Sequence, residues 1–485
     1  MTLFLLGLAI LLVGYFTYGK MIARIVGPDD RETPAHRCAD GVDYVTLPHW
    51  KNMLIQLVNI AGVGPVIGVI LGIKFGTIAF LLIPVGNILG GAVHDFLGGM
   101  MSLRSDGANL PRIIREKLGT AYYRVFAVLI VFLLLLVVTV FVNIPASLVA
   151  GFFPKNPVFF WVVVGIFAYY LIATLFPVDK IIGRVYPFFG MILFVGTAAL
   201  FVSLLMRMFQ SPTDILAETE AFRDKMILDP LIPCLFVTIA CGIISGFHAT
   251  QSPIIARTMK TEREAYSSFY GMMILEGFIA MIWAAAAMAI YQQMPEMMGE
   301  KPQNVLPVIT ADFLGKGFGA VTILAVIILA ITSGDTALRS LRMSLAEIFH
   351  IPQKTLKNRL LLCVPPTLII IVLLAWSNRD AKSFNILWNY FAWGNQILAA
   401  STLMAGTAWL LSLRKWWWVA GVPGCFMTFT VITYILWTSP DRGGPIGLGL
   451  PLELAYGIAA AGTAILFAGV FWRGMGLRKM VENET

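Results

Sequence analysis

Long runs of apolar residues are the feature that most limits what this chain can fold into. The runs are about 20 residues long, the length that a helix needs to cross about 30 Å of hydrocarbon, and they lack the two-residue alternation of membrane β-strands. Only 13% of the residues are charged, against about 25% in soluble proteins. We therefore expect an all-α polytopic membrane protein, and we exclude both a disordered chain and a nucleic-acid-binding role for the scattered net charge of +8.

The apolar runs predict thirteen transmembrane helices. They cover residues 2–24, 52–73, 77–101, 120–150, 157–176, 184–208, 231–256, 267–292, 318–339, 359–376, 384–412, 416–437 and 451–473. With the N-terminus outside, 25 of the 35 lysines and arginines fall in the cytoplasmic loops and tail. This is the bias that the positive-inside rule describes, so we expect an external N-terminus and a cytoplasmic C-terminus.

Two of the predicted helices contain helix-breaking residues in mid-span. One reads IAGVGPVIG at 60–68 and the other reads CGIISGFHATQSP at 241–253. Proline removes a backbone hydrogen bond and glycine weakens a helix by about 1 kcal/mol relative to alanine, although small residues also serve close helix packing. The two segments are five helices apart and therefore cross in opposite directions. Such a pair indicates the inverted repeats of a secondary transporter.

This pairing predicts the domain organisation and a substrate site at the two breaks. The first helix and a cytoplasmic connector occupy 1–51, inverted repeat 1 occupies 52–208, inverted repeat 2 occupies 231–412, and peripheral C-terminal helices with a tail occupy 413–485. Asn395 and Gln396 lie where helix 384–412 begins with unusual polarity, which a substrate-facing surface and an interfacial aromatic belt both explain. The candidate substrate-binding residues are Ala61, Gly62, Val63, Gly64, Pro65, Ser245, Gly246, Phe247, His248, Gln251, Asn395 and Gln396.

Ionisable residues within apolar spans are costly in lipid, so a functional role is the default hypothesis. The candidates for coupling are His94, Asp95, His248, Glu276 and Asp335. Structural alternatives remain open: an ion pair between Asp335 and Arg339 on one helix face, a gate or cap at His94 and Asp95, and a protonated Glu276 bonded to a neighbouring helix.

The coupling ion is not decided by these residues. A histidine and a carboxylate at one site suit proton coupling, because burial and partners move their pKa values towards neutrality. The hydroxyls of Thr332 and Ser333, with the broken backbone at Gly62, would suit sodium instead. Other metals and cofactors are not expected. His36, Cys38 and His49 in the connector form a weak zinc candidate, since their spacing matches no standard site.

Five motifs, in order, resemble the carbon starvation A family of membrane transporters. They are IAGVGPVIG at 60–68, GAVHD at 91–95, SGFHATQSP at 245–253, SGDTALRS at 333–340 and WGNQILAA at 393–400. The resemblance extends from about residue 1 to residue 412. It implies a leucine-transporter-like five-helix inverted repeat, a bacterial or archaeal inner membrane, and uptake of peptides during carbon starvation, or of pyruvate in some relatives, where the link to protons favours a proton over sodium.

Three other classes of protein compete with a transporter. A membrane enzyme is disfavoured because HExxH, GxSxG and P-loop motifs are absent from the sequence. A channel is disfavoured because the polar residues cluster at mid-membrane and at helix ends. A transporter-like nutrient sensor stays open as the alternative. We therefore expect a secondary active transporter in the lipid bilayer that imports small peptides or a small carboxylate such as pyruvate, driven by a proton or sodium gradient.

Overall fold

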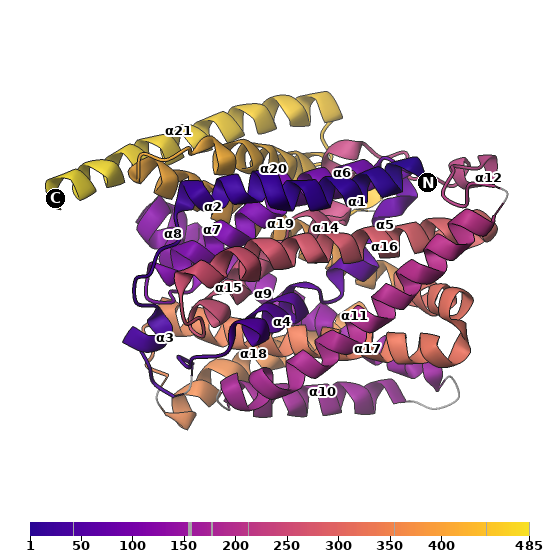
Figure 1. Ribbon diagram of the computed structural model, residues 1–485, viewed down its shortest axis with the longest axis horizontal. Helices are drawn as coiled ribbons and strands as arrows, with labels where there is room; N and C mark the ends of the chain where they lie inside the picture. Colours follow the sequence, from indigo (N-terminus) through magenta and orange to yellow (C-terminus); the bar gives the residue numbers. More distant parts are fainter. Residues whose placement is uncertain are drawn as a thin grey trace.

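The fold is a single bundle of long helices. It was obtained as a computed structural model, which describes residues 1–484 except 42, 154–157, 176–177, 212, 354 and 443. Within those residues no β-strand occurs beyond an isolated bridge between Glu32 and Thr261. The long helices run along a common direction, with the two ends of the chain at opposite ends of the bundle (Figure 1).

The first half of the chain supplies eleven of the helices. They are α1 (Thr2–Gly14), continued by a π-helical turn (Tyr15–Gly19) into α2 (Lys20–Val26); α3 (Pro34–Arg37); α4 (His49–Ile60), then η2 (Gly64–Gly68), α5 (Val69–Gly72) and η3 (Ile73–Phe75); α6 (Ala79–Gly86), continued by η4 (Asn87–Gly91) into α7 (Ala92–Leu103); α8 (Leu110–Leu118); α9 (Thr120–Phe152); α10 (Val158–Leu175); and α11 (Val178–Gln210). Residues 157 and 176, the predicted limits of one helix, lie outside the described residues.

The second half repeats the pattern of a broken helix followed by long helices. Its elements are α12 (Glu220–Arg223); η5 (Leu231–Leu235), α13 (Phe236–Thr238), α14 (Ala240–Ile243) and α15 (Gly246–Ala256); η7 (Tyr266–Gly271), α16 (Met272–Gln293) and η8 (Pro295–Gly299); α17 (Pro302–Phe349); α18 (Leu356–Ser377); α19 (Ala381–Ser412); α20 (Trp418–Trp437); and α21 (Leu452–Glu484).

Fewer helices are long and apolar enough to be membrane spans than the thirteen that the sequence predicted. In the described part of the chain, nine helices are long and apolar enough to cross a membrane, and α4 with its continuation to Phe75, bent by 48°, makes a tenth. The predicted spans 157–176, 231–256 and 384–412 do not meet this criterion, because the first is short, the second is broken and the third is polar at its start. The count of thirteen therefore stays a prediction.

Helix α17 differs from its predicted limits of 318–339. Gly315 has φ +74°, and the helix bends at this residue. Residues 302–314 therefore fold back against the helical turn that begins at Lys316. The fold-back is close, since a Cβ on Gly319 would lie 2.7 Å from the Thr310 carbonyl oxygen. The sequence contains no apolar run of span length between residues 293 and 317, yet in the helix that forms there Leu306, Ile309 and Phe313 make a buried face.

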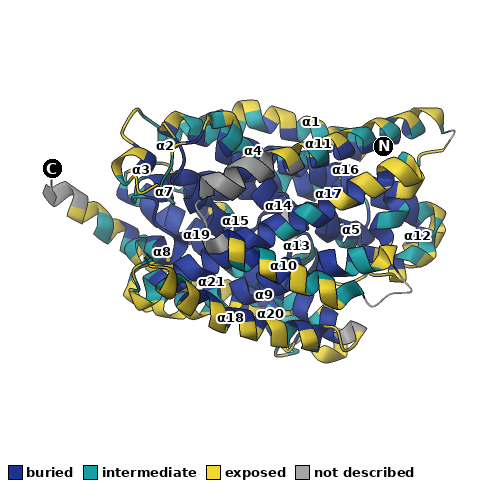
Figure 2. Cartoon of the chain, turned by 90° about the horizontal axis from the view of Figure 1, so that it is seen from below, coloured by how far each residue is buried: buried dark blue, intermediate teal, exposed yellow. Residues whose placement is uncertain are grey.

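The two broken helices cross at the centre of the bundle. A Cβ on Gly242 would lie 2.9 Å from Cγ1 of Val69, and a Cβ on Gly68 would lie 3.4 Å from the Thr238 carbonyl oxygen. Helix α15 also packs on α4, α7 and α19, while α4 packs on α11, α16 and α17. Buried residues therefore fill the middle of the bundle and exposed residues lie on the outer helices (Figure 2).

Residues 27–48, which we call the connector, cover the end of the bundle at which α2 ends (Figure 1). The Thr33 hydroxyl donates to the Met259 carbonyl oxygen at 2.6 Å, and the Leu47 N–H donates to the Thr258 carbonyl oxygen at 2.9 Å. Leu47 and Thr33 are buried. The connector is therefore fixed against the segment that comes after α15. The orientation expected from the sequence would place this end on the cytoplasmic side, so we call it the inner end and we call the opposite end, where Met1 lies, the outer end.

Candidate functional site

Four buried ionisable side chains from three helices meet near the crossing of the broken helices. Asp95 on α7 places Oδ1 2.8 Å from His94 Nδ1 and Oδ2 3.1 Å from His248 Nδ1 on α15. His248 Nε2 lies 3.8 Å from Oε2 of Glu276 on α16. None of the four is more than 1% exposed. The sequence singled out each of them as a candidate, and the structure joins them into a His94–Asp95–His248–Glu276 chain, which we call the ionisable chain.

The two ends of the ionisable chain have unused hydrogen-bonding capacity. His94 Nε2 and both carboxylate oxygens of Glu276 have no hydrogen-bond partner among the described residues. Between these ends, His248 faces a carboxylate on each side. Because imidazole can accept a proton at one ring nitrogen while it donates from the other, this geometry can carry a proton between α16 and α7.

The second break is held in place by amide side chains of α19. Asn395 Oδ1 accepts from the Phe247 N–H at 2.7 Å, and its Nδ2 donates to the Ser245 hydroxyl at 2.9 Å. Gln396 Nε2 donates to the Ile244 carbonyl oxygen at 3.3 Å, while its Oε1 has no partner in the described part of the chain. A Cβ on Gly246 would collide with the Asn395 carbonyl oxygen. The amides at 395 and 396, expected at the substrate, therefore position the start of α15.

The first break brings two residues of the candidate sodium site together. The Ser333 hydroxyl on α17 donates to the carbonyl oxygens of Val58 and Asn59 at 3.3 and 3.4 Å, where α4 ends. A Cβ on Gly62 would lie 2.6 Å from that hydroxyl oxygen. Thr332 instead donates to the Leu329 carbonyl oxygen at 2.9 Å within its own helix. Ala61, Val63, Gly64 and Pro65 complete the buried break.

Arg339 links α17 to the connector at the inner end. Its Nη1 lies 3.3 Å from Asp43 Oδ1, and its Nη2 donates to the Ala173 carbonyl oxygen at 2.7 Å. Burial by itself would raise the pKa of Asp43, but the guanidinium groups of Arg339 and Arg342 hold that pKa below its ordinary value. Arg339 thus pairs with a carboxylate of the connector and closes the inner end. Its expected pair with Asp335, which is fully buried in α17, stays a prediction.

Two buried amides on α4 were not predicted as site residues. Gln56 and Asn59 are 0% exposed, and neither polar side-chain atom of either residue has a hydrogen-bond partner within the described residues. Leaving a buried polar group unpaired costs about 1–3 kcal/mol, so these amides are available for a ligand beside the first break. Their sequence signal is the spacing of Asn52, Gln56 and Asn59, which places three amides on one face of an apolar helix.

The weak zinc candidate in the connector is wrong. His49 Nε2 lies 2.7 Å from the Ser267 hydroxyl oxygen. Among the residues that the structure describes, no three side chains of His, Cys, Asp or Glu are arranged to hold a metal ion. His36, Cys38 and His49 therefore do not form a metal site.

Two broken helices that cross within a bundle of membrane helices define the leucine-transporter-like fold, and solved structures agree. The manganese transporter of Eremococcus coleocola aligns with a TM-score of 0.56 and 14% identity over 91% of this chain and 99% of that one. A Na⁺-coupled sialic acid symporter aligns with a TM-score of 0.50 and 13% identity over 97% of both chains. At these identities the likeness shows the fold alone.

The chain belongs to the carbon starvation protein CstA family, whose model matches residues 1–178, 153–314 and 309–434. It is 39% identical to an uncharacterized membrane protein of Haemophilus influenzae, over 58% of this chain and 89% of that protein. It is 25% identical to the peptide transporter CstA of Escherichia coli, over 87% and 79% of the two chains. It is 28% identical to the pyruvate/proton symporter BtsT of E. coli, over 58% and 48%.

These relatives confirm the family that the motifs suggested. Together with the fold they make this chain a transporter of the inner membrane and not an enzyme.

Proposed function

We propose that the protein imports a short peptide or a small carboxylate such as pyruvate, coupled to the entry of a proton, with its N-terminus outside. The observation that carries this proposal is the ionisable chain, because it lies between α7, α15 and α16 where the broken helices meet. Relatives named as a peptide transporter and a pyruvate/proton symporter support the substrate classes and the ion. The positive charge of the predicted cytoplasmic loops supports the orientation.

In this proposal the substrate lies between residues 61–65 and 245–248. The helical segment that begins at Gly64 presents its N-terminal end to the first break, and a helix N-terminus favours a negatively charged group such as a substrate carboxylate. Gln56, Asn59 and the unpartnered Oε1 of Gln251 would then bond the remaining polar groups of the substrate.

The proton is carried by Glu276 and passed to His248. A fully buried carboxylate whose oxygens have no hydrogen-bond donor is costly as an anion, so Glu276 holds the proton while the site is closed. A movement of α15 that shortens the 3.8 Å separation between Glu276 and His248 transfers the proton towards Asp95. Sodium is the second candidate ion, because Ser333 and Gly62 lie at the freed carbonyl oxygens of Val58 and Asn59, with the buried carboxylate of Asp335 on the same helix.

The test is uptake by purified protein in liposomes, with labelled dialanine or pyruvate under an inward proton gradient. His248→Ala should lower accumulation by about tenfold or more, which corresponds to about 1.4 kcal/mol or more, because the relay loses its middle group. Glu276→Gln should abolish proton-driven accumulation but retain exchange of substrate in counter-flow. His36→Ala, at an exposed position of the connector, is the matched control and should transport as the wild type does.

Unchanged accumulation in His248→Ala would remove the ionisable chain from the mechanism. Accumulation driven by sodium and insensitive to a protonophore would replace the proton with sodium. Substrate binding without any exchange in counter-flow would overturn transport itself and favour a nutrient sensor.

A further inference from the structure

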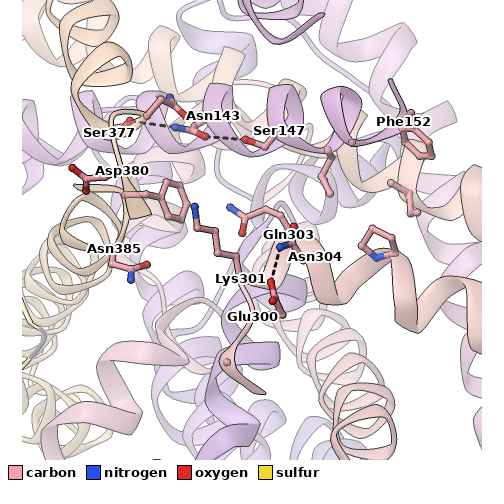
Figure 3. A pocket seen from close by; sticks show the side chains of 17 residues that line it. Asn143, Ser147, Phe152, Glu300, Lys301, Gln303, Asn304, Ser377, Asp380 and Asn385 are labelled. Atoms are coloured by element: carbon pink, nitrogen blue, oxygen red, sulfur yellow. Dashed lines mark hydrogen bonds between the residues drawn. The ribbon is translucent and has the colours of Figure 1, made fainter. Parts of the chain in front are cut away.

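The outer end of the bundle contains a large polar cavity that the proposed function does not use. Its volume is about 840 Å³, within the range of about 300–1,000 Å³ that is typical of small-molecule sites. The last part of α9, residues 299–307 around the start of α17, the end of α18 and the start of α19 form its walls (Figure 3). This cavity lies at the opposite end of α17 from the connector.

Several polar side chains of the cavity wall are hydrogen-bonded to one another, which fixes their positions. Asn143 is 1% exposed; its Nδ2 donates to the Ser377 hydroxyl at 3.2 Å and its Oδ1 accepts from the Ser147 hydroxyl at 3.2 Å. Glu300 Oε2 accepts from Asn304 Nδ2 at 2.8 Å. These pairs fix the α9, α18 and α17 walls of the cavity (Figure 3).

One buried acceptor in the cavity has no partner. Gln303 is 9% exposed, and its Oε1 makes no hydrogen bond among the described residues. Its side chain extends into the cavity beside Lys301 (Figure 3). Since an unpaired buried carboxamide oxygen is costly, a ligand that brings an N–H group would satisfy it.

The lining of the cavity contains one ammonium group, that of Lys301, together with the carboxylates of Glu300 and Asp380. The Lys301 ammonium group lies 5.8 Å from the centroid of the Phe384 ring and, within the described part of the chain, no carboxylate lies within ion-pairing distance of it. Carboxylates form short, charge-assisted hydrogen bonds with such groups. The side chains at 301 and 303 therefore offer one site for a carboxylate and one for an N–H donor.

A layer of aromatic rings separates the cavity from the ionisable chain. Phe141, two residues before Asn143 on α9, has its ring centroid 5.5 Å from that of Phe247 and 6.2 Å from that of Phe391. All three rings are buried, and Phe247 directly precedes His248. These buried rings therefore connect the α9 wall of the cavity to the segment of α15 that carries His248.

We propose that this cavity is an outer receiving site that holds the substrate before it passes the aromatic layer. Lys301 binds the free carboxylate, and the Gln303 carboxamide oxygen accepts a hydrogen bond from a peptide N–H, so the ligand is a short peptide with a free C-terminus. Pyruvate offers the carboxylate but no N–H group. The assignment of the ligand rests on the proposed function, whereas the binding site is testable without transport.

The experiment is calorimetric titration of the purified full chain with dialanine, with dialaninamide, which lacks the carboxylate, and with pyruvate. The wild type should bind dialanine about tenfold more tightly than the other two ligands. Lys301→Gln should weaken dialanine binding by about tenfold and leave dialaninamide unchanged. Gln303→Leu should weaken both peptides. Lys316→Gln, an exposed lysine of the same helix away from the cavity, is the matched control and should leave all affinities unchanged.

Three results would each overturn the receiving site. The first is an equal affinity for dialanine in the wild type and in Lys301→Gln. The second is an equal loss of affinity for dialanine and dialaninamide in Lys301→Gln, and the third is tighter binding of pyruvate than of dialanine. Liposome uptake separates the two proposals. If dialanine binding depends on Lys301 but dialanine does not accumulate in liposomes, the receiving site is supported and transport is rejected. Accumulation of dialanine with an unchanged KM in Lys301→Gln keeps transport and rejects the receiving site.

Discussion

The two ends of this transporter are closed in different ways. At the inner end the connector is fixed by backbone hydrogen bonds and by ion pairs, such as Asp43 with Arg339 at 3.3 Å and Arg31 with Glu262 at 3.6 Å. At the outer end there is a cavity of about 840 Å³, and the buried rings of Phe141, Phe247 and Phe391 connect its α9 wall to α15. Paired charges therefore hold the inner end, whereas the outer end contains an open space.

Under the proposed function, this difference would make the outer end the side that receives substrate. Removing one partner of a buried ion pair costs about 3–5 kcal/mol, so opening the inner end would be costly. The outer end already contains a space for a ligand. Substitutions or pH changes that alter one end, with the other as a reference, test this difference.

The largest effect is expected at the inner end, from Asp43→Asn. The substitution removes the Asp43 carboxylate from the Arg339 guanidinium group, which is 1% exposed, and breaking a buried pair of this kind costs about 3 kcal/mol. Thermal unfolding in detergent should show a clear loss of stability, and the connector should become accessible to protease. Asp224→Asn, at an exposed position at the outer end, is the control and should change stability by less than about 0.5 kcal/mol. Equal stability of the two variants would mean that this ion pair does not hold the inner end.

An intermediate effect is expected at the outer end, from Gly315→Ala. Gly315 has φ +74° and ψ 166°, a region adopted essentially by glycine alone that costs another residue about 1–3 kcal/mol, so residues 302–314 should lose their fold-back and the cavity should lose its shape. Dialanine affinity should fall several-fold while protease resistance of the connector stays at the wild-type level. Gly317→Ala, two residues away with open space around its Cβ position, should preserve both properties. Equal dialanine affinity in both variants would show that the bend does not shape the cavity.

The smallest effect is expected when pH is changed at the inner end. Arg339 and Arg342 outweigh burial and hold the pKa of Asp43 below its ordinary value of 3.8. A carboxyl group with a lowered pKa contributes stability that is complete above the ordinary value and is lost as pH falls through the lowered one. Hydrogen-exchange protection of the Leu47 N–H, corrected for the intrinsic rate, should therefore be constant between about pH 5 and pH 8. A loss of protection within that window would show that another group titrates at the inner end.

Much of this architecture could be predicted because its signals are local. Apolar length indicates spans, and the glycines and proline at 60–68 indicate a break whatever lies around them. His94, Asp95, His248 and Glu276 could be found because any ionisable residue in an apolar run is conspicuous. Their connection could not be predicted, since Asp95 contacts not only its neighbour His94 but also His248, which is 153 residues away in sequence.

The residues that were missed or reassigned show the same limit. Gln56 and Asn59 carried a readable pattern, with Asn52, of amides on one helix face, but amides are less conspicuous than charges. The helix at 302–314 was overlooked because a short amphipathic helix lacks the apolar length of a span. Asn395 could contact substrate or support the second break, and the choice depends on how α19 packs on α15. No local sequence pattern indicates this packing.

Helix α17 extends from the outer cavity, past the first break, to the connector, and this length affects how a leak of ions through the protein is prevented. Gln303 lies at the outer cavity, Ser333 at the first break and Arg339 at the connector. Between Ser333 and Arg339 the helix is unbroken, so the two points travel together, whereas the bend at Gly315 lets residues 302–314 move separately. Under the proposed function, substrate would enter the outer cavity without disturbing the inner ion pair, whereas a displacement of the first break would also move Arg339 and its pair with Asp43. A continuous pore would dissipate the driving gradient without transporting substrate. Such a pore would require the stiff segment from Ser333 to Arg339 to stay still while the first break and the connector both moved.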